Sequence, residues 1–294
     1  MNRAEEDLAD RFERLRPHLL RVAYSQLGEL GEAEDVVQEA WLRLGRVDAP
    51  SIGDLRAWLT TTVARLALDA LGSARARRER YVGQWLPEPL LAPDTSGPSQ
   101  DPADRVTLDE SVSFALLVVL ERLSPAERTA FVLADVFGLP FEEIAAIVGR
   151  SPAACRQLAS RARAHVTENR PRFPADEQRH GQVVRAFAAA VAGGDMADLL
   201  RVLAPTAVMR SDGGGRVNAA RRPLQGAERV ARAVLALART MGPADVREVS
   251  VNGLLGLLVD AGAERTVCAF TVDAGQIVAV DLVRNPDKLR LTAP

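Results

Sequence analysis

The sequence predicts a multidomain protein in which two all-α segments precede a smaller α+β segment. Apolar residues recur at helical spacings of three and four in residues 1–72 and again in 109–170. Between these segments, five prolines from Pro87 to Pro102 exclude a continuous helix. From about residue 178, helical runs alternate with β-like runs. We therefore expect domains at 1–72 and 109–170, a linker at 73–108 and a third domain at 178–294.

Composition excludes several classes of protein. The chain has 294 residues, of which 47% are hydrophobic and 26% are charged, a balance typical of a soluble globular protein. It contains no apolar run of about 18 residues and no secretory h-region near its acidic start. Two distant cysteines, Cys155 and Cys268, do not indicate a disulfide framework or a cysteine-rich zinc site. We expect a cytoplasmic protein without membrane association, metal or cofactor.

Charge is distributed unevenly, although the net charge is only −2. The segment 29–39 holds five acids and no base, whereas 75–80 holds four arginines against one glutamate, and 150–172 holds six against one. Lys288 is the only lysine. A GC-rich genome explains this preference for arginine, so the arginine content alone is not evidence for phosphate binding.

The first helical segment contains a helix with two distinct faces. In Ala33–Leu44 the apolar residues form one stripe, while Asp35, Gln38 and Glu39 point elsewhere. This acidic face suits a basic helical partner, and a merely solvated face is the alternative. A second helix is predicted over Leu55–Leu71, ending at Gly72.

The second helical segment contains a predicted helix-turn-helix. Phe141, Ile144, Ala145 and Val148 form one apolar face, and Gly149 ends that helix where a tight turn needs positive φ. Ser151 is the expected N-cap and Pro152 the first residue of the next helix. Its inward residues are Cys155, Leu158, Ala162 and Val166, so Cys155 is predicted to be a core residue.

The outward face of that second helix carries the side-chain types expected of a DNA-reading helix. Arginine and glutamine reach base edges in the major groove, and a small residue allows close approach. The candidate DNA-binding residues are Ser151, Ala153, Arg156, Gln157, Ser160, Arg161 and Arg163. An ordinary helical hairpin with a solvated arginine face is the alternative.

The pattern of the third segment predicts an α+β domain. Helices are predicted at Gln182–Ala192, Ala197–Leu203 and Ala227–Thr240. The predicted strands are Ala207–Met209, Val246–Val251, Gly256–Val259, Thr266–Val272 and Ile277–Val283. Turn residues at Asp260–Gly262 and Asp273–Gly275 predict hairpins.

Two motif sets resemble the extracytoplasmic-function (ECF) sigma factors. Ser124–Arg128 with Leu139–Arg163 resembles sigma domain 4, which reads the −35 promoter element, and Glu32–Glu39 resembles the domain 2 helix that binds the β′ clamp of RNA polymerase. Leu55–Asp69 resembles the −10-recognition helix. The resemblance implies that core polymerase (β′ clamp helices and β flap) and promoter DNA are partners. It assigns polymerase binding to Asp35, Gln38 and Glu39, and −10 binding to Asp48, Ser51, Arg56, Trp58, Thr61 and Arg65.

The remaining motifs are similar to the SigJ-type group of ECF factors, whose members carry a SnoaL-like extension. This extension has the nuclear transport factor 2-like fold, an α+β cone that contacts the sigma domains and tunes their activity. We expect Asn285–Leu289 to dock near the linker segment Trp85–Leu90 and to control domain spacing, with Asn285–Asp287 forming a turn that presents Lys288 and Leu289 outward. The alternative is that both segments are ordinary surface loops. The residues of this predicted regulatory contact are Trp85, Leu86, Pro87, Glu88, Pro89, Leu90, Asp212, Gly213, Gly214, Asn285, Pro286, Asp287, Lys288 and Leu289.

Relatives of the SnoaL-like fold include isomerases and cyclases, so an enzyme is one alternative. Asp195, Asp198, Asp212 and His180 are the candidates, but no acid–base pair or metal cluster assembles from them. A helix-turn-helix regulator fused to a ligand-binding or vestigial isomerase-like domain is the other alternative. We expect a sigma factor that directs promoter-specific transcription initiation, is not an enzyme, and is modulated by its own extension, with an unknown small ligand in the cone as a further possible partner.

Overall fold

The computed structural model describes residues 3–47, 52–79, 81–93, 112–169 and 176–289. The chain divides into two compact units. Unit 1 comprises residues 1–79, 100–112 and 119–168, and unit 2 comprises 80–99, 113–118 and 169–294. Helix α5 (Phe114–Leu120) therefore contributes to both.

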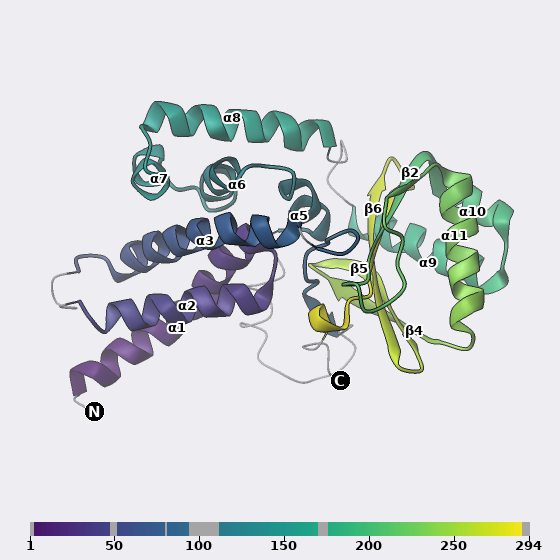
Figure 1. Ribbon diagram of the computed structural model, residues 1–294, viewed down its shortest axis with the longest axis horizontal. Coiled ribbons are helices and arrows are strands. Elements are labelled where there is room, and N and C mark those ends of the chain that lie inside the picture. The colour runs from purple at the N-terminus through teal and green to yellow at the C-terminus, as the bar shows by residue number, and fades with distance from the viewer. Residues whose placement is uncertain (1–2, 48–51, 80, 94–111, 170–175, 290–294) are drawn as a thin grey trace. The chain divides into compact units, whose positions relative to one another are not determined.

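Unit 1 is entirely helical where it is described. Its first three helices, α1 (Arg3–Leu27), α2 (Leu30–Leu44) and α3 (Leu55–Glu79), pack against one another (Figure 1). The predicted stripe on α2 is buried except for Trp41, which is half-buried against Phe12. The expected end at Gly72 is wrong, because α3 continues to Glu79. Gly72 is exposed inside the helix, where glycine lowers helix stability through its low helix propensity but does not end the helix.

The second part of unit 1 contains the helix-turn-helix. The helices of this part include α6 (Pro125–Phe131), α7 (Phe141–Val148) and α8 (Pro152–Asn169), of which α7 and α8 form the helix-turn-helix. A single π-helical turn (Val132–Val136) connects α6 to the loop before α7. Ile144, Cys155 and Leu158 are buried, as predicted.

In its described residues, unit 2 is a mixed sheet with three helices on one face. Helices α9 (Glu177–Gly193), α10 (Met196–Val202) and α11 (Ala227–Met241) form one apolar core with the sheet (Figure 1). The strand order is β1-β4-β5-β6-β7-β2-β3, and all neighbours are antiparallel except β2 and β7. The strands are β1 (Leu91–Pro93), β2 (Leu203–Asp212), β3 (Leu224–Gln225), β4 (Asp245–Val251), β5 (Leu254–Ala261), β6 (Glu264–Asp273) and β7 (Gln276–Val283).

The opposite face of this sheet carries a second apolar cluster. Here Leu86 and Phe114 join Val267, Val283 and Leu289. Successive residues of a strand point to opposite faces, so β6 places Val267 in this cluster and Cys268 in the helix-facing core. Both predicted hairpins are confirmed, β5–β6 and β6–β7. The strand β1 was not predicted: residues expected to be linker extend the sheet by pairing with β4.

Candidate nucleic-acid interface and linker dock

The turn between α7 and α8 has the backbone geometry that the sequence predicts. Gly149 adopts φ 69°, a left-handed conformation that favours glycine. The Ser151 hydroxyl accepts a hydrogen bond from the Ala154 backbone N–H at 3.2 Å, which caps the start of α8. The two helices are thereby held with one face of α8 inward and the other exposed.

The outward face of α8 gathers the predicted −35 residues, all of which are exposed. Three arginines on it already have acidic partners, which sequence reasoning did not foresee. Arg156 pairs with Glu142 at 3.0 Å, Arg161 with Glu127 at 3.2 Å and Arg163 with Asp135 at 2.8 Å. Exposed ion pairs of this kind contribute only about 0–1 kcal/mol, so a phosphate or a base edge can replace the carboxylate.

The motif Ser124–Arg128 builds the start of α6. Ser124 and Glu127 form a reciprocal capping box, with the Ser124 hydroxyl donating to the Glu127 carboxylate at 2.6 Å. This hydrogen bond, assisted by Arg161, holds the pKa of Glu127 below its usual value against the opposing effect of burial. The cap fixes where α6 begins and therefore where Arg128 points.

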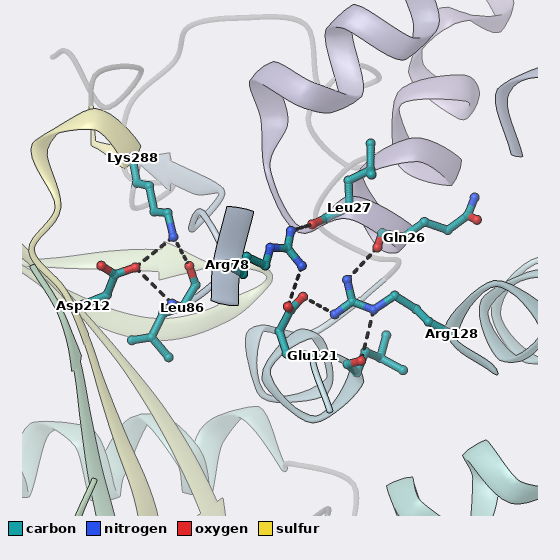
Figure 2. A network of polar contacts seen from close by, with 9 residues as sticks. Gln26, Leu27, Arg78, Leu86, Glu121, Arg128, Asp212 and Lys288 are labelled. Carbon is teal, nitrogen blue, oxygen red and sulfur yellow. Dashed lines mark hydrogen bonds and ion pairs between the residues drawn. The ribbon is translucent and has the colours of Figure 1, made fainter. Parts of the chain in front are cut away.

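Arg128 is buried and connects the two parts of unit 1. Its guanidinium donates to the backbone oxygens of Gln26 at 2.7 Å and Leu120 at 3.1 Å and pairs with Glu121 (Figure 2). Arg78 pairs with the same Glu121 carboxylate at 2.5 Å and donates to the Leu27 oxygen at 2.6 Å. The sequence identifies Arg128 only as part of a family motif and gives no sign of its burial.

The predicted −10 residues lie along α3 where they are described. Asp48 and Ser51 fall outside the described residues. Arg56 is exposed, whereas Trp58 and Thr61 are half-buried. Arg65 is exposed but donates to the Ala146 oxygen of α7 at 2.8 Å. This face of α3 therefore already contacts the helix-turn-helix at one point.

His18 lies beneath the start of this face. Its Nε2 is 3.1 Å from the Thr60 hydroxyl, and its Nδ1 is 3.5 Å from the Arg56 guanidinium. Burial, followed by the charges of Arg56 and Arg21, lowers the pKa of His18 from 6.5 to about 4. The imidazole is therefore neutral at physiological pH.

The predicted polymerase-binding residues share one side of α2. Asp35 and Gln38 are exposed, and Glu39 pairs with Arg43 at 2.9 Å near the surface. The buried stripe of α2 fixes this polar side outward.

Within unit 2, the segment 85–90 packs against two other predicted segments, 212–214 and 285–289. We call this contact the linker dock. Leu86, Pro87, Pro89 and Leu90 are buried in it. The Leu90 backbone N–H donates to the Asn252 side-chain oxygen at 3.1 Å, and the Asn252 N–H donates to the Leu90 oxygen at 2.9 Å. Sequence reasoning missed Asn252.

Asp212 is the acceptor at the centre of the linker dock and is fully buried. Its carboxylate accepts hydrogen bonds from the Leu86 N–H at 3.0 Å, the Tyr81 hydroxyl at 2.6 Å and the Gly214 N–H at 3.0 Å. It also forms an ion pair with Lys288 at 2.8 Å (Figure 2). A buried carboxylate with this many donors orders the segments that supply them.

Lys288 binds the linker from the C-terminal side. Its ammonium donates to the Leu86 oxygen and lies 4.1 Å from the centre of the Trp85 ring. Asn285 donates to the Tyr81 hydroxyl at 2.8 Å and caps the short helix that places Lys288. The segment 285–289, which we call the tail, thus lies against the linker as the sequence predicts. However, Lys288 and Leu289 are buried, 6% and 5% exposed, and do not point outward. Both side chains are buried because they find their partners within unit 2.

Glycine is required where the Asp212–Gly214 segment meets the tail. Gly214 has φ 62°, and a Cβ there would clash with the Asn285 side chain. A Cβ at Gly213 would clash with the Val217 backbone oxygen. The glycines therefore allow the close approach that brings Asn285 to Tyr81.

The candidate catalytic residues have structural roles. Asp195 caps α10, Asp198 pairs with Arg201, and the buried His180 ring lies 2.8 Å from the Leu255 oxygen. Among the described residues, no group of three or more His, Cys, Asp or Glu side chains is placed to hold a metal ion. None of the described helices is both long and apolar enough to cross a membrane.

Comparisons with known proteins agree with this arrangement. The model of sigma-70 region 2 matches residues 11–77, and that of sigma-70 region 4 matches residues 113–166. The chain is 44% identical over 290 residues to the ECF RNA polymerase sigma factor SigJ of Mycobacterium tuberculosis, covering 94% of this chain and 91% of SigJ. It is 39% identical over 279 residues to the probable ECF sigma factor SigI of the same species, covering 93% and 92%. A crystal structure of Mycobacterium tuberculosis SigJ matches with a TM-score of 0.79 at 40% identity, covering 96% of this chain and 98% of that chain.

Regions 2 and 4, with the helix-turn-helix in the second of them, define the class: this is a sigma factor of RNA polymerase. The extent of the match then identifies the family, and the chain belongs to the ECF RNA polymerase sigma factors. It directs transcription initiation, is not an enzyme, and interacts with core RNA polymerase and promoter DNA. The predicted fold class is confirmed in its two helical sigma regions and its C-terminal α+β unit.

Proposed function

We propose that the outward face of α8 reads the −35 element through Arg156 and Gln157, with Ser160 and Arg161 beside them. The observation that carries this proposal is the exposure of these side chains on one face while the opposite face of α8 is buried. Arginine and glutamine form bidentate hydrogen bonds with base edges, each worth about 1–3 kcal/mol of discrimination. Arg163 supplies a phosphate contact.

Region 2 supplies the other two contacts in this proposal. Asp35, Gln38 and Glu39 bind the clamp helices of core polymerase, and the exposed acidic side of α2 supports this role. Arg56, Trp58, Thr61 and Arg65 face the −10 element. Because Arg65 already donates to the Ala146 oxygen, its use on DNA requires α3 and α7 to separate at that point. The β flap is the proposed polymerase partner of region 4.

The linker dock gives the C-terminal unit its regulatory role in this proposal. The linker joins the two promoter-reading regions, so whatever holds the linker limits how far apart they are placed. Support comes from its buried polar contacts: Asp212 and Lys288 together bind both the N–H and the oxygen of Leu86. Retaining Leu86 in the dock shortens the free linker, and releasing it lengthens the linker.

Promoter reading is tested by run-off transcription with purified core enzyme on a promoter library randomised at the −35 element. Arg156→Ala should reduce transcription and relax the preference at one position, because a contact worth about 1–3 kcal/mol is lost. Arg179→Ala, an exposed arginine of α9, is the control. Unchanged output and unchanged preference for Arg156→Ala would contradict the proposal.

Regulation is tested by deleting residues 285–294, which removes Lys288 but leaves the strands of unit 2 intact. Promoter activity should differ from that of the full chain, and Trp85 emission should shift after Trp41 and Trp58 are replaced by Phe. The shift is expected because the deletion removes the ammonium group from its place over the Trp85 ring. Identical activity and identical emission would show that the tail does not regulate through the linker dock.

A further inference from the structure

Unit 2 contains an apolar cavity between its helices and its sheet. Its volume is about 750 Å³, within the range of small-molecule sites. The walls come from α9, α11, β4, β5 and β6, and include Phe187, Val191, Leu235, Leu257 and Val259. Arg239 and Gly242 are exposed lining residues, so the cavity opens to solvent near the end of α11.

One polar group inside this cavity is unsatisfied. Thr266 lines the cavity and is only 1% exposed, and its hydroxyl has no hydrogen-bond partner within the described part of the chain. It shares the helix-facing side of β6 with Cys268, which also lines the cavity. A buried hydroxyl without a partner is unfavourable, so a ligand oxygen that pairs with it gains specificity as well as affinity.

The chemistry of the inner wall selects an uncharged ligand. Burial raises the pKa of the Cys268 thiol to about 12, so this thiol stays neutral. The single charged lining residue, Arg239, lies on the exposed rim. The wall thus offers apolar contact everywhere except at the Thr266 hydroxyl, where one hydrogen bond can form.

The strand that carries Thr266 also supports the linker dock. The neighbours of Thr266 and Cys268 on β6, Val267 and Ala269, point to the other face and belong to the apolar cluster of Leu86. Adjacent β5 repeats this arrangement, since Leu257 lines the cavity and Leu258 lies in the cluster of Leu86. A ligand and the linker therefore pack on opposite sides of the same two strands.

We propose that unit 2 binds a neutral, mostly hydrocarbon molecule carrying one hydroxyl or carbonyl oxygen at Thr266, and that β5 and β6 couple this site to the linker dock. The coupling deepens the regulatory role proposed above and rests on it, whereas the binding site does not. By thermodynamic linkage, loosening the linker changes ligand affinity as much as ligand changes linker docking.

The binding site is tested on the full-length chain by fluorescence titration with 2-naphthol and with naphthalene, which lacks the oxygen. We expect both to bind saturably. Thr266→Val keeps the side-chain shape and should weaken 2-naphthol about three- to tenfold, the effect of one hydrogen bond, while naphthalene stays within about twofold. Thr271→Val is the matched control, because it lies on the same strand with its side chain on the opposite face.

Absence of saturable 2-naphthol binding, or equal weakening of both probes by Thr266→Val, would overturn the site.

The coupling is tested by the same titration on Leu86→Ala, with the exposed Val82→Ala as control. We expect at least about a threefold change in 2-naphthol affinity for Leu86→Ala and none for Val82→Ala. If Leu86→Ala does not fold, Leu86→Val replaces it. Unchanged affinity would refute the coupling, and because no polymerase is present, that result is distinct from a failure of promoter regulation.

Discussion

Replacing Lys288 by Met tests whether the linker dock is held by its buried ion pair. The substitution keeps most of the side-chain volume and removes the ammonium group that contacts both Asp212 and the Leu86 oxygen. Removing one partner of a buried pair costs about 3–5 kcal/mol, because the remaining charge stays buried. Asp212 retains hydrogen bonds from Leu86, Tyr81 and Gly214, so we expect the lower end, about 3 kcal/mol.

A loss of about 3 kcal/mol corresponds to roughly a hundredfold shift in the docking equilibrium. Hydrogen exchange of the Leu86 amide reports this equilibrium directly, since that amide donates to Asp212 in the docked state. Exchange should be roughly a hundredfold faster in Lys288→Met. Arg216→Met is the matched control: its pair with Asp287 is solvent-exposed and contributes about 0–1 kcal/mol. Leu86 exchange within about threefold of the unaltered chain would refute this reasoning.

Three further predictions concern unit 1. Reversing the charges of Asp35 and Glu39 to Lys should abolish co-purification with core polymerase while circular dichroism is unchanged; Glu34→Lys is the control, and normal co-purification contradicts the role of α2. Arg128→Met should lower the free energy of unfolding in urea by about 3–5 kcal/mol because Arg128 is buried and paired, whereas Arg161→Met should cost under about 1 kcal/mol; equal costs would show that burial of Arg128 is unimportant. The lowered pKa of His18 means that the unfolded chain binds a proton first, so stability should fall as the pH drops from 6.5 through 4. His18→Gln should flatten the dependence of the free energy of unfolding on pH. An unchanged slope in this variant would show that His18 is not its source.

Local patterns predicted the elements that depend on local forces. The spacing of Ile144 and Ala145, the left-handed Gly149 and the Ser151 cap all follow from interactions within a few residues, and the structure contains each of them. The same holds for the β5–β6 hairpin, whose turn residues adjoin its strands. These features are readable because the partners lie close together in the chain.

Contacts between distant residues were harder to predict. The strand β1 includes Pro93, which lacks a backbone N–H and therefore predicts an interruption of the strand. It is tolerated because β1 is an edge strand of the sheet. Arg128 and Gln26 are 102 residues apart, and nothing in either local sequence indicates that they meet. The approach of the tail to the linker was predicted, but the burial of Lys288 was not, because it depends on the acceptor at Asp212.

The ion pairs along α8 determine how promoter binding responds to salt. DNA binding normally gains free energy by releasing the cations condensed on its phosphates, with a slope of log K against log salt near −0.9 for each phosphate neutralised. Arg156, Arg161 and Arg163 must first give up a carboxylate, which then attracts cations of its own. Each such exchange returns part of the released counterions to the protein. Binding through α8 should therefore show a shallower salt dependence than its arginines alone imply, and neutralising Glu142, Glu127 and Asp135 should steepen it.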